Sequence, residues 1–513
     1  METGEVLVID LFAGPGGLGE GISSCEHKNG NKPFQIGVSV EKEASAHKTL
    51  TTRSFYRKIK DLTGGSADYY QYVRGNISRA ELFQFYPEQA TEAIEETLDG
   101  PKALGEDNKL IHNRICELIA GHRGPKVVIG GPPCQAYSIA GRSRNAGIEG
   151  YKAEKDHRNF LYMEYLKVLS IAQPNVFIME NVRGILSAKL NGKIMFPQIL
   201  KDLRNPGRVT KIQKVPTYKI YSLVVDANNP NNPQYKDSSD FLIRSEQYGI
   251  PQARHRVILI GVREDAGVIP ETITRADNTI SVESILSDLP PLRSGFSKRK
   301  DEANVWTQTI SKQAKQLKKI FAKEYENLLV DSLDLEPIKG LERKSSQHNN
   351  INEAKIPAPL KDWLIDENLE CVLNHETRGH IEADLLRYAF CAAHAKLNNG
   401  VSPKSRDFPE VLAPAHKNWK TGTHADRFRV QTADKCATTV TSHISKDGNY
   451  FVHYDAKQCR SLTVREAARL QTFPDNYLFE GNRTQQYVQV GNAVPPFLAQ
   501  QIGMIVLNLL DGM

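Results

Sequence analysis

The chain is 513 residues long, with 40% hydrophobic and 25% charged residues, a balance typical of soluble globular proteins. This length corresponds to at most about three domains and can bury a real core, so a disordered chain, a collagen-like repeat and a disulfide-stapled miniprotein are excluded. The 66 Lys and Arg residues outnumber the 60 Asp and Glu residues, and the resulting net charge of +6 permits a nucleic-acid partner without requiring one.

The chain has no window of 18 consecutive apolar residues, and its N-terminus lacks the basic region and cleavage signal of a secretory peptide. These features predict a cytoplasmic protein without a membrane partner. The 7 cysteines are odd in number, widely spaced and free of any C-x-x-C pair. We therefore expect neither a disulfide framework nor a metal site.

Five continuous apolar runs, rich in β-branched residues, mark the first half of the chain. Such runs are typical of central strands in a parallel sheet that is covered on both faces. Polar residues or glycines follow each run, at the strand ends where open α/β sheets bind ligands. With helical stretches between the runs, such as 159–171, residues 1 to about 265 predict one doubly wound domain. The runs are 6–9, 36–40, 127–129, 176–179 and 257–260.

The pattern changes between about 270 and 460, where apolar runs shorten and basic residues form three clusters. Helical patterns return at 463–471 and at about 495–510. Basic clusters are often only solvated surface, but here they also suit contacts with the phosphates of a nucleic acid. The clusters are Arg293, Lys298, Arg299 and Lys300; Lys312, Lys315, Lys318 and Lys319; and Lys404, Arg406, Lys417, Lys420, Arg427 and Arg429.

A glycine loop follows the first run, where residues 10–21 read D-L-F-A-G-P-G-G-L-G-E-G. Gly14, Gly16 and Gly19 match G-x-G-x-x-G, which allows a tight turn and close approach of a ligand to the backbone. Glu41 ends the next run, where it can accept hydrogen bonds from ribose hydroxyls. The loop predicts an adenosine cofactor on a Rossmann-like sheet, and both NAD and S-adenosylmethionine fit it.

A second group of reactive residues follows the later strands. In G-G-P-P-C-Q, two prolines fix the backbone before Cys134, and a helix N-terminus there would favour its thiolate. Glu180 follows four apolar residues in M-E-N-V, a setting that favours burial, a raised pKa and proton sharing with a substrate. Arg254 and Arg256 share one face if the segment is extended, and can hold a phosphate or a carbonyl oxygen.

Six motifs in this order resemble the DNA (cytosine-5) methyltransferase family, of the bacterial restriction–modification type. They are D-L-F-A-G-P-G-G, G-G-P-P-C-Q, E-N-V, Q-x-R-x-R, R-E-A-A-R-L-Q-T-F-P-D and Q-V-G-N-A-V-P-P. The resemblance implies an α/β fold: a Rossmann-like S-adenosylmethionine-dependent methyltransferase sheet with a second, smaller target-recognition domain. Residues 1–270 and 461–513 would form the catalytic domain, and 271–460 the DNA-binding target-recognition domain.

The resemblance also implies residue roles. Cys134 would attack C6 of cytosine, Glu180 would contact N3 and the exocyclic amine, and Arg256, helped by Arg254, would hold O2. The family has an Asp after its third strand that contacts the adenine amine; Asn76 is the better candidate here and Asp61 the weaker. The implied cofactor residues are Phe12, Gly14, Gly16, Leu18, Glu41, Asn76, Pro133, Asn492 and Ala493, and the implied DNA-binding residues are Gln135, Arg465 and Thr439.

The implied function is sequence-specific methylation of C5 in a flipped-out cytosine of double-stranded DNA. S-adenosyl-L-methionine would be converted to S-adenosyl-L-homocysteine through a covalent intermediate between Cys134 and C6. We expect a monomer that protects host DNA and is paired functionally with a cognate restriction endonuclease. The residues do not identify the base that removes the C5 proton, and a water can fill that role.

Three other functions share parts of this pattern. An NAD(P) oxidoreductase has the glycine loop and an acid like Glu41, but no use for Pro-Pro-Cys with Glu-Asn-Val. An amino-methyltransferase would carry a motif like Pro-Pro-Tyr. An RNA cytosine methylase would have a much shorter region before the last motifs, so the insert of about 190 residues favours duplex DNA.

Overall fold

The computed structural model describes residues 3–133, 157–190, 192–324, 333–347, 355–415, 419 and 426–513. Its contacts divide the chain into two compact units. The first unit comprises Met1–Tyr248, Arg254–Ala276 and Ala493–Met513, and the second comprises Gly249–Ala253 and Asp277–Asn492.

A seven-stranded sheet forms the centre of the first unit, in the order β2-β1-β3-β4-β10-β7 with β8 paired to β10. All five apolar runs predicted as strands lie in this sheet. The strands are β1 (Val6–Leu11), β2 (Phe34–Val40), β3 (Lys126–Gly130), β4 (Val176–Val182), β7 (Tyr218–Ser222), β8 (Leu242–Arg244) and β10 (His255–Arg263).

The expectation of a parallel sheet is confirmed for β1 to β4 and wrong for the fifth run. β10 runs antiparallel to β4, β7 and β8. Only the short segment 245–254 joins β8 to β10, and parallel neighbours need a crossover of a dozen or more residues. The apolar composition of the run predicted a buried strand correctly but carried no information on its direction.

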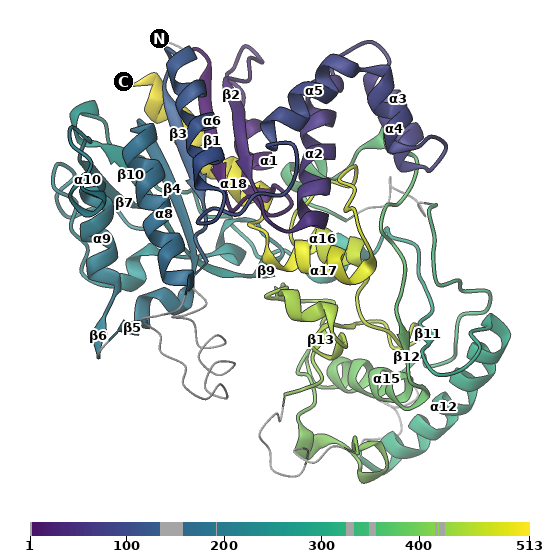
Figure 1. Ribbon diagram of the computed structural model, residues 1–513. Helices are drawn as coiled ribbons and strands as arrows, with labels where there is room; N and C mark the ends of the chain where they lie inside the picture. The colour runs from purple at the N-terminus through teal and green to yellow at the C-terminus, as the bar shows by residue number, and fades with distance from the viewer. Residues whose placement is uncertain are drawn as a thin grey trace. The chain divides into compact units, whose positions relative to one another are not determined.

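Helices cover both faces of the sheet (Figure 1). On one face, α6 (Asn108–Gly121), α8 (His157–Ala172) and α9 (Phe196–Arg204) pack on β1, β3 and β4 in a shared hydrophobic core. The predicted helix 159–171 is therefore confirmed as α8. The other helices of this unit are α1 (Gly17–Ser23), α2 (Ala44–Ile59), α3 (Gly65–Val73), α4 (Arg79–Phe85), α5 (Pro87–Glu96), α10 (Pro206–Thr210) and α18 (Pro496–Asp511).

Helix α1 packs closely against α18, which brings the C-terminal segment into the first unit. Gly21 of α1 lies against the Pro496 carbonyl and the Ala499 methyl, and Gly503 of α18 lies against the Cys25 sulfur. The Cys25 thiol donates to the carbonyl of Gln500 over 3.4 Å. The two helices approach so closely because neither glycine carries a Cβ.

The segment Arg483–Asp511, which includes α17 (Arg483–Asn492) and α18, is long and apolar enough by length and composition to cross a membrane. However, 67% of its most apolar window is buried inside the fold, as in the core helix of a soluble protein. The predicted helix at about 495–510 is confirmed as α18.

The second unit has a separate core between α12 (Ala303–Glu324) and α15 (Glu382–Leu397). Its other α-helices are α11 (Val282–Leu286), α14 (Ala358–Leu364), α16 (Val464–Leu470) and α17. The predicted helix at 463–471 is confirmed as α16, with Thr463 as its N-cap. The strands pair two by two: β9 (Gln252–Ala253) with β14 (Ala437–Thr438), β11 (Gly295–Phe296) with β12 (Gly379–His380), and β13 (Val430–Gln431) with β15 (Val452–His453).

Residues 461–492 belong to the second unit by contact, although the sequence motifs placed them with the catalytic domain. α17 packs on the short helix Ser442–Ser445, where Gly491 lies against the backbone of Ser442. The assignment of catalytic and target-recognition roles to the two parts of the chain stays a prediction.

The glycine contact between α1 and α18 can be tested with Gly21→Ala. The added methyl overlaps the Pro496 carbonyl and the Ala499 methyl, so we expect the free energy of unfolding to fall by about 1–3 kcal/mol. Gly121→Ala at the end of α6 is the control, because its Cβ would meet nothing within 4 Å. Equal urea-unfolding midpoints for the two variants would contradict the close contact.

Candidate active site

The chain leaves β1 through a loop whose backbone is strongly left-handed. Phe12, Gly14 and Gly16 have φ values of 56°, 59° and 97°. A Cβ added to Gly14 would meet nothing within 4 Å, so open space lies over the loop at this glycine. This is the cradle that a ligand needs when it approaches a backbone closely.

Glu41 fixes this loop from the end of β2. Its Oε2 accepts the Gly14 N–H over 2.8 Å, and its Oε1 accepts the Glu43 N–H over 2.7 Å. Burial raises the pKa of this carboxyl. Each carboxylate oxygen has a second lone pair, so Glu41 can still accept hydrogen bonds from the hydroxyls of a ligand.

Asp10 in β1 is a buried acid, the first residue of the D-L-F-A-G-P-G-G motif, to which the sequence assigned no role. Its side chain is 1% exposed, and neither oxygen has a hydrogen-bond partner among the described residues. Burial raises its pKa to about 8; the charges of Glu96 and Glu41 add to this, and Arg57 opposes it. At this pKa the Asp10 carboxyl is mostly protonated near pH 7, and a cation bound close to it would favour its charged form.

Asn76 and Asp61, the candidates for the adenine contact, both lie outside the sheet. Asn76 is exposed in the turn after α3, where its amide donates to Gln71 Oε1 over 2.7 Å; Asp61 is exposed after α2. Instead, segment 97–104 runs beside the end of β2, since the Lys102 N–H donates to the Glu41 carbonyl over 2.9 Å. The helices α3 to α5 separate this segment from β2 in the sequence, so its position beside β2 could not be predicted (Figure 1). The acid in this segment is Asp99.

Asn181 joins the ends of β3 and β4. Its Nδ2 donates to the buried carbonyl of Pro132 over 2.9 Å, and its Oδ1 accepts the Val182 N–H over 2.8 Å. Gly131 permits this approach, because a Cβ there would lie 2.9 Å from Glu180 Oε2. Sequence reasoning quoted the Glu-Asn-Val motif but gave its Asn no role. The sequence does place this amide at a strand end, where a side chain can bond to the loop that follows a neighbouring strand.

The loop after β3 continues through Pro133, which is half-buried. The predicted nucleophile Cys134 and the predicted DNA contact Gln135 follow it directly and lie outside the described residues.

Glu180, Arg254 and Arg256 lie together beside this loop. Arg256 Nε is 2.8 Å from Glu180 Oε1, and the two side chains are 13% and 14% exposed. Arg254 is fully buried; burial and the Arg256 charge lower its pKa, whereas Glu180 opposes this shift. Two guanidinium groups with one carboxylate form a site that suits an electron-rich oxygen of a substrate.

The remaining predicted residues lie at several places. Leu18 is buried in α1, and Phe12 is half-buried against the core of the first unit. Asn492 is exposed at the end of α17 in the second unit, and Ala493 is buried in the first. The Thr439 hydroxyl donates to the Ala253 carbonyl over 2.6 Å, beside the β9–β14 pair.

Arg465 was predicted to bind DNA, and its position corrects that prediction. Its side chain is fully buried, and its guanidinium donates to the carbonyls of Leu373, Pro474 and Tyr477. The R-E-A-A-R-L motif therefore stabilises the second unit from within. Its other charges are paired: Glu466 binds Arg460 through two hydrogen bonds of 2.7 Å, and Arg469 binds Asp288 and Asp475.

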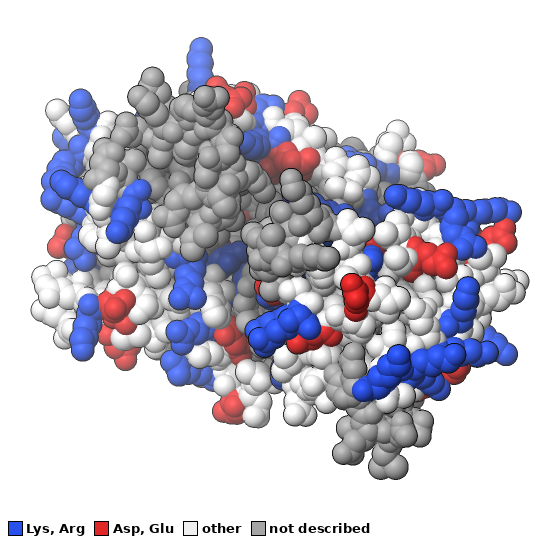
Figure 2. Space-filling view, turned by 90° about the horizontal axis from the view of Figure 1, so that it is seen from below, with Lys and Arg blue, Asp and Glu red and all other residues white. Residues whose placement is uncertain are grey.

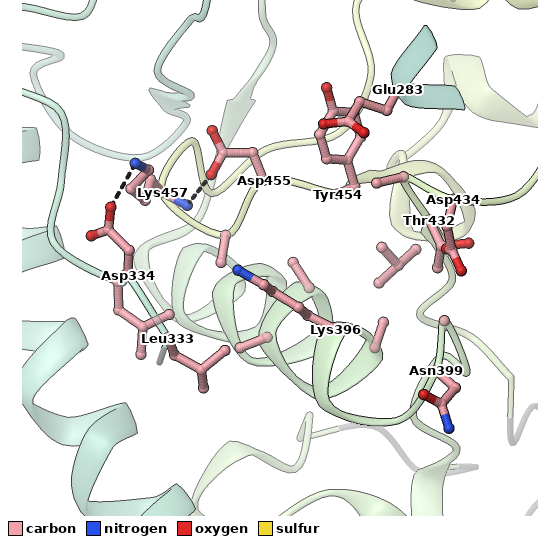
Figure 3. A pocket seen from close by; sticks show the side chains of 18 residues that line it. Glu283, Leu333, Asp334, Lys396, Asn399, Thr432, Asp434, Tyr454, Asp455 and Lys457 are labelled. Carbon is pink, nitrogen blue, oxygen red and sulfur yellow. Dashed lines mark hydrogen bonds and ion pairs between the residues drawn. The ribbon is translucent and has the colours of Figure 1, made fainter. Parts of the chain in front are cut away.

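The second unit also contains a cavity of about 590 Å³ beside α15 (Figure 3). Its floor is formed by alanines of α15, and its rim carries four acids and two lysines. The Lys457 ammonium donates to Asp334 Oδ2 over 2.8 Å, so part of the rim charge is paired. No predicted site residue lines this cavity.

Three buried histidines lie around the R-E-A-A-R-L motif. Burial lowers the pKa of His375 and His453 to about 4 and that of His380 to about 3. His375 is held between the Thr463 hydroxyl and the Pro290 carbonyl, at 2.9 Å from each. These rings are neutral in the folded protein near pH 7.

The second unit should lose stability as the pH falls from about 6.5 to about 4. In the unfolded chain these histidines take up protons near pH 6.5, but the folded chain resists protonation until about pH 4. Each of these histidines therefore leaves the free energy of unfolding unchanged above this window. Within the window, each lowers it by about 1.4 kcal/mol for every unit by which the pH falls. His453→Gln should reduce the pH slope of the unfolding free energy, whereas the control His443→Gln, at an exposed position, should not. A flat profile in the wild type would refute the buried neutral state.

Comparisons with known proteins identify the family of this chain. The sequence profile of the family "C-5 cytosine-specific DNA methylase" matches residues 103–237 and 239–507. The type II methyltransferase M.Bpa9945I of Bacillus paralicheniformis is 34% identical over 528 residues, which cover 99% of this chain and 100% of that protein.

The DNA (cytosine-5-)-methyltransferase M.ApeKI of Aeropyrum pernix is 26% identical over 436 residues, covering 75% of this chain and 81% of that protein. Among solved structures, the methyltransferase EhMeth of Entamoeba histolytica matches with a TM-score of 0.41 at 14% identity, covering 98% of each chain. The profile match and the full-length relative show that this chain belongs to the C-5 cytosine-specific DNA methylase family and is a DNA (cytosine-5-)-methyltransferase.

Proposed function

We propose that this protein methylates C5 of a flipped-out cytosine at a specific sequence of double-stranded DNA, through a covalent bond to Cys134. The observation that carries the proposal is the group formed by Glu180, Arg254 and Arg256 beside the Gly131–Pro133 loop, from which Cys134 follows directly. A carboxyl group, two guanidinium groups and a thiol are the groups that this reaction needs.

The residues around the glycine loop fit S-adenosylmethionine, which when bound supplies a methyl group from a sulfonium. Glu41 would accept hydrogen bonds from the ribose hydroxyls, and the open backbone at Gly14 would let the ligand approach. Asp10, whose carboxyl is mostly protonated near pH 7 without a cation, would become charged beside a bound sulfonium and stabilise it. Phe12, Gly16, Leu18, Pro133, Asn492 and Ala493 stay proposed contacts, and Asp99 replaces Asn76 as the proposed adenine contact.

Cytosine C5 is too weak a nucleophile to take a methyl group directly. Addition of the Cys134 thiolate to C6 forms an S–C bond and turns the ring into an enamine, which makes C5 nucleophilic. Glu180 would stabilise the charge at N3, and Arg256 would hold O2. After methylation a base, not identified by these residues, removes the C5 proton; the S–C bond then breaks and returns the thiolate.

Among the described cysteines, several are chemically unsuited to this role. Burial raises the pKa of Cys25 to about 12, and it also raises the pKa of Cys391 and that of Cys459. A thiol with a raised pKa provides little thiolate at neutral pH. The raised pKa values of these three thiols argue against them as nucleophiles and are consistent with the proposed role of Cys134.

The cytosine ring is not accessible within a stacked duplex, so the base must flip out, at a cost of roughly a few kcal/mol. We propose that residues 271–460 recognise the DNA sequence, and that Gln135 and Thr439 lie near the DNA. The type II name of the full-length relative supports a role in host-DNA protection. We also propose that the protein is a cytoplasmic monomer that is paired functionally with a cognate restriction endonuclease.

The proposal predicts that Cys134→Ser abolishes methyl transfer, with kcat reduced at least about 10³-fold, because a serine hydroxyl does not add to C6 at neutral pH. DNA affinity and melting temperature should stay close to wild type. The measurement is incorporation of tritiated methyl groups into plasmid DNA, with Cys116→Ser, at an exposed position, as the matched control. Turnover by Cys134→Ser within tenfold of wild type would overturn the nucleophile assignment.

A further inference from the structure

The three basic clusters predicted from the sequence differ strongly in how many of their charges are paired. In the first cluster Arg293 is buried against Asp301, Arg299 pairs with Glu382, and Lys300 pairs with Glu302, so that only Lys298 has no ion pair among the described residues. In the third cluster each described arginine also faces an acid. These pairs are Arg406 with Asp407, Arg427 with Asp447, and Arg429 with Asp426.

The middle cluster forms the outer face of α12, and its positive charges are not neutralised by ion pairs with described acids. Lys312, Lys315, Lys318, Lys319 and Lys323 are all exposed, and none forms an ion pair within the part of the chain that the structure describes. The other exposed positions of α12 with described side chains are Asn304, Gln308, Gln316 and Ala322, so no described acid interrupts this face. α12 lies at the lower right of Figure 1, and Lys and Arg outnumber Asp and Glu over the right-hand side of Figure 2.

The opposite face of α12 anchors the helix in the core of the second unit. Trp306, Leu317 and Phe321 are fully buried, and the ring of Phe321 stacks on Phe390 of α15 at 5.4 Å. The Trp306 indole N–H donates to the Ser294 hydroxyl over 2.9 Å. The lysines therefore project outward from a rigid helix rather than from a mobile loop.

We propose that this lysine face of α12 binds the phosphodiester backbone of duplex DNA independently of its sequence. The inference rests on the proposed function, which makes DNA the substrate. Lys312 to Lys323 extend over about 16 Å of helix, and duplex DNA carries one negative charge per about 1.7 Å. Ammonium groups suit phosphates as point charges and carry no information on base identity.

A membrane surface is a poorer match for the same face. A helix that lies in a membrane interface inserts its apolar side between the lipids, but the apolar side of α12 is already buried in the protein core. The face therefore provides affinity through charge alone, which is the mode of sequence-independent DNA binding.

The test combines Lys312→Gln, Lys315→Gln, Lys319→Gln and Lys323→Gln in one variant. Binding of a fluorescent 30-base-pair mixed-sequence duplex is followed by anisotropy from 50 to 200 mM KCl. We expect affinity at 100 mM KCl to fall at least tenfold, and the slope of log K against log salt to fall by up to about 3.6, since each phosphate contact contributes about 0.9.

The matched control changes four exposed lysines of the second unit outside α12 to Gln: Lys300, Lys339, Lys344 and Lys404. This control removes the same amount of charge as the α12 variant. Because the proposal assigns DNA binding to α12, the affinity of the control should stay within about threefold of wild type. An unchanged slope in the α12 variant, or an equal loss in the control, would overturn the proposal. So would loss of binding to anionic phosphatidylserine vesicles without loss of DNA binding.

Methylation of plasmid DNA by the wild type is measured in parallel, so that the two proposals fail separately. A wild type that transfers methyl groups to DNA, together with an α12 variant that binds DNA normally, would refute only the role of α12. A wild type that binds DNA through α12 but transfers no methyl group would refute only the proposed reaction.

Discussion

The hydrogen bond from Asn181 to the Pro132 carbonyl is the interaction on which the candidate site depends. It holds the loop after β3 against the end of β4, at the point where Gly131 leaves room for the Glu180 carboxylate. β10 then brings Arg256 to the same carboxylate from its antiparallel position beside β4. Because Asn181 is buried, loss of its amide would leave the Pro132 carbonyl without its partner, at a cost of about 1–3 kcal/mol. The loop that leads to Cys134 is thus positioned by β4.

Buried charge serves different purposes in the two units. In the second unit Arg460, Glu466 and Arg469 are fully paired, so this network holds the region together and has no charge left for a ligand. In the first unit the Asp10 carboxyl lacks a hydrogen-bond partner among the described residues, and Arg256 pairs with Glu180. Incompletely compensated buried groups cost folding free energy and are typical of sites that bind a charged or polar ligand.

Much of the first unit could be predicted from the sequence, because apolar runs and glycine spacing report burial and tight turns directly. The strands β1 to β4 and the glycine loop are local consequences of such patterns, whereas the grouping of Glu180 with Arg254 and Arg256 was expected only from the family resemblance. The direction of β10, the burial of Arg465 and the position of Asn76 were beyond reach, because each depends on contacts between distant segments. The basic clusters were also only partly predictable. The sequence gives the number of lysines and arginines in each cluster, but their ion pairs depend on acids that the fold brings close to them.

The most direct test of the central claim uses a random-sequence duplex that carries 5-fluorocytosine in place of cytosine. Fluorine replaces the C5 hydrogen that a base must remove as a proton before the S–C bond can break. The proposed reaction therefore stops with the protein still bound to the base. With S-adenosylmethionine present, we expect a complex that survives denaturation, in which mass spectrometry finds Cys134 bonded to C6 and a methyl group on C5. Asn181→Ala should form it more slowly, because the loop that carries Cys134 loses its hydrogen bond. A denaturation-resistant complex through another cysteine, or methylation of ordinary DNA with no such complex on the fluorinated duplex, would contradict the account.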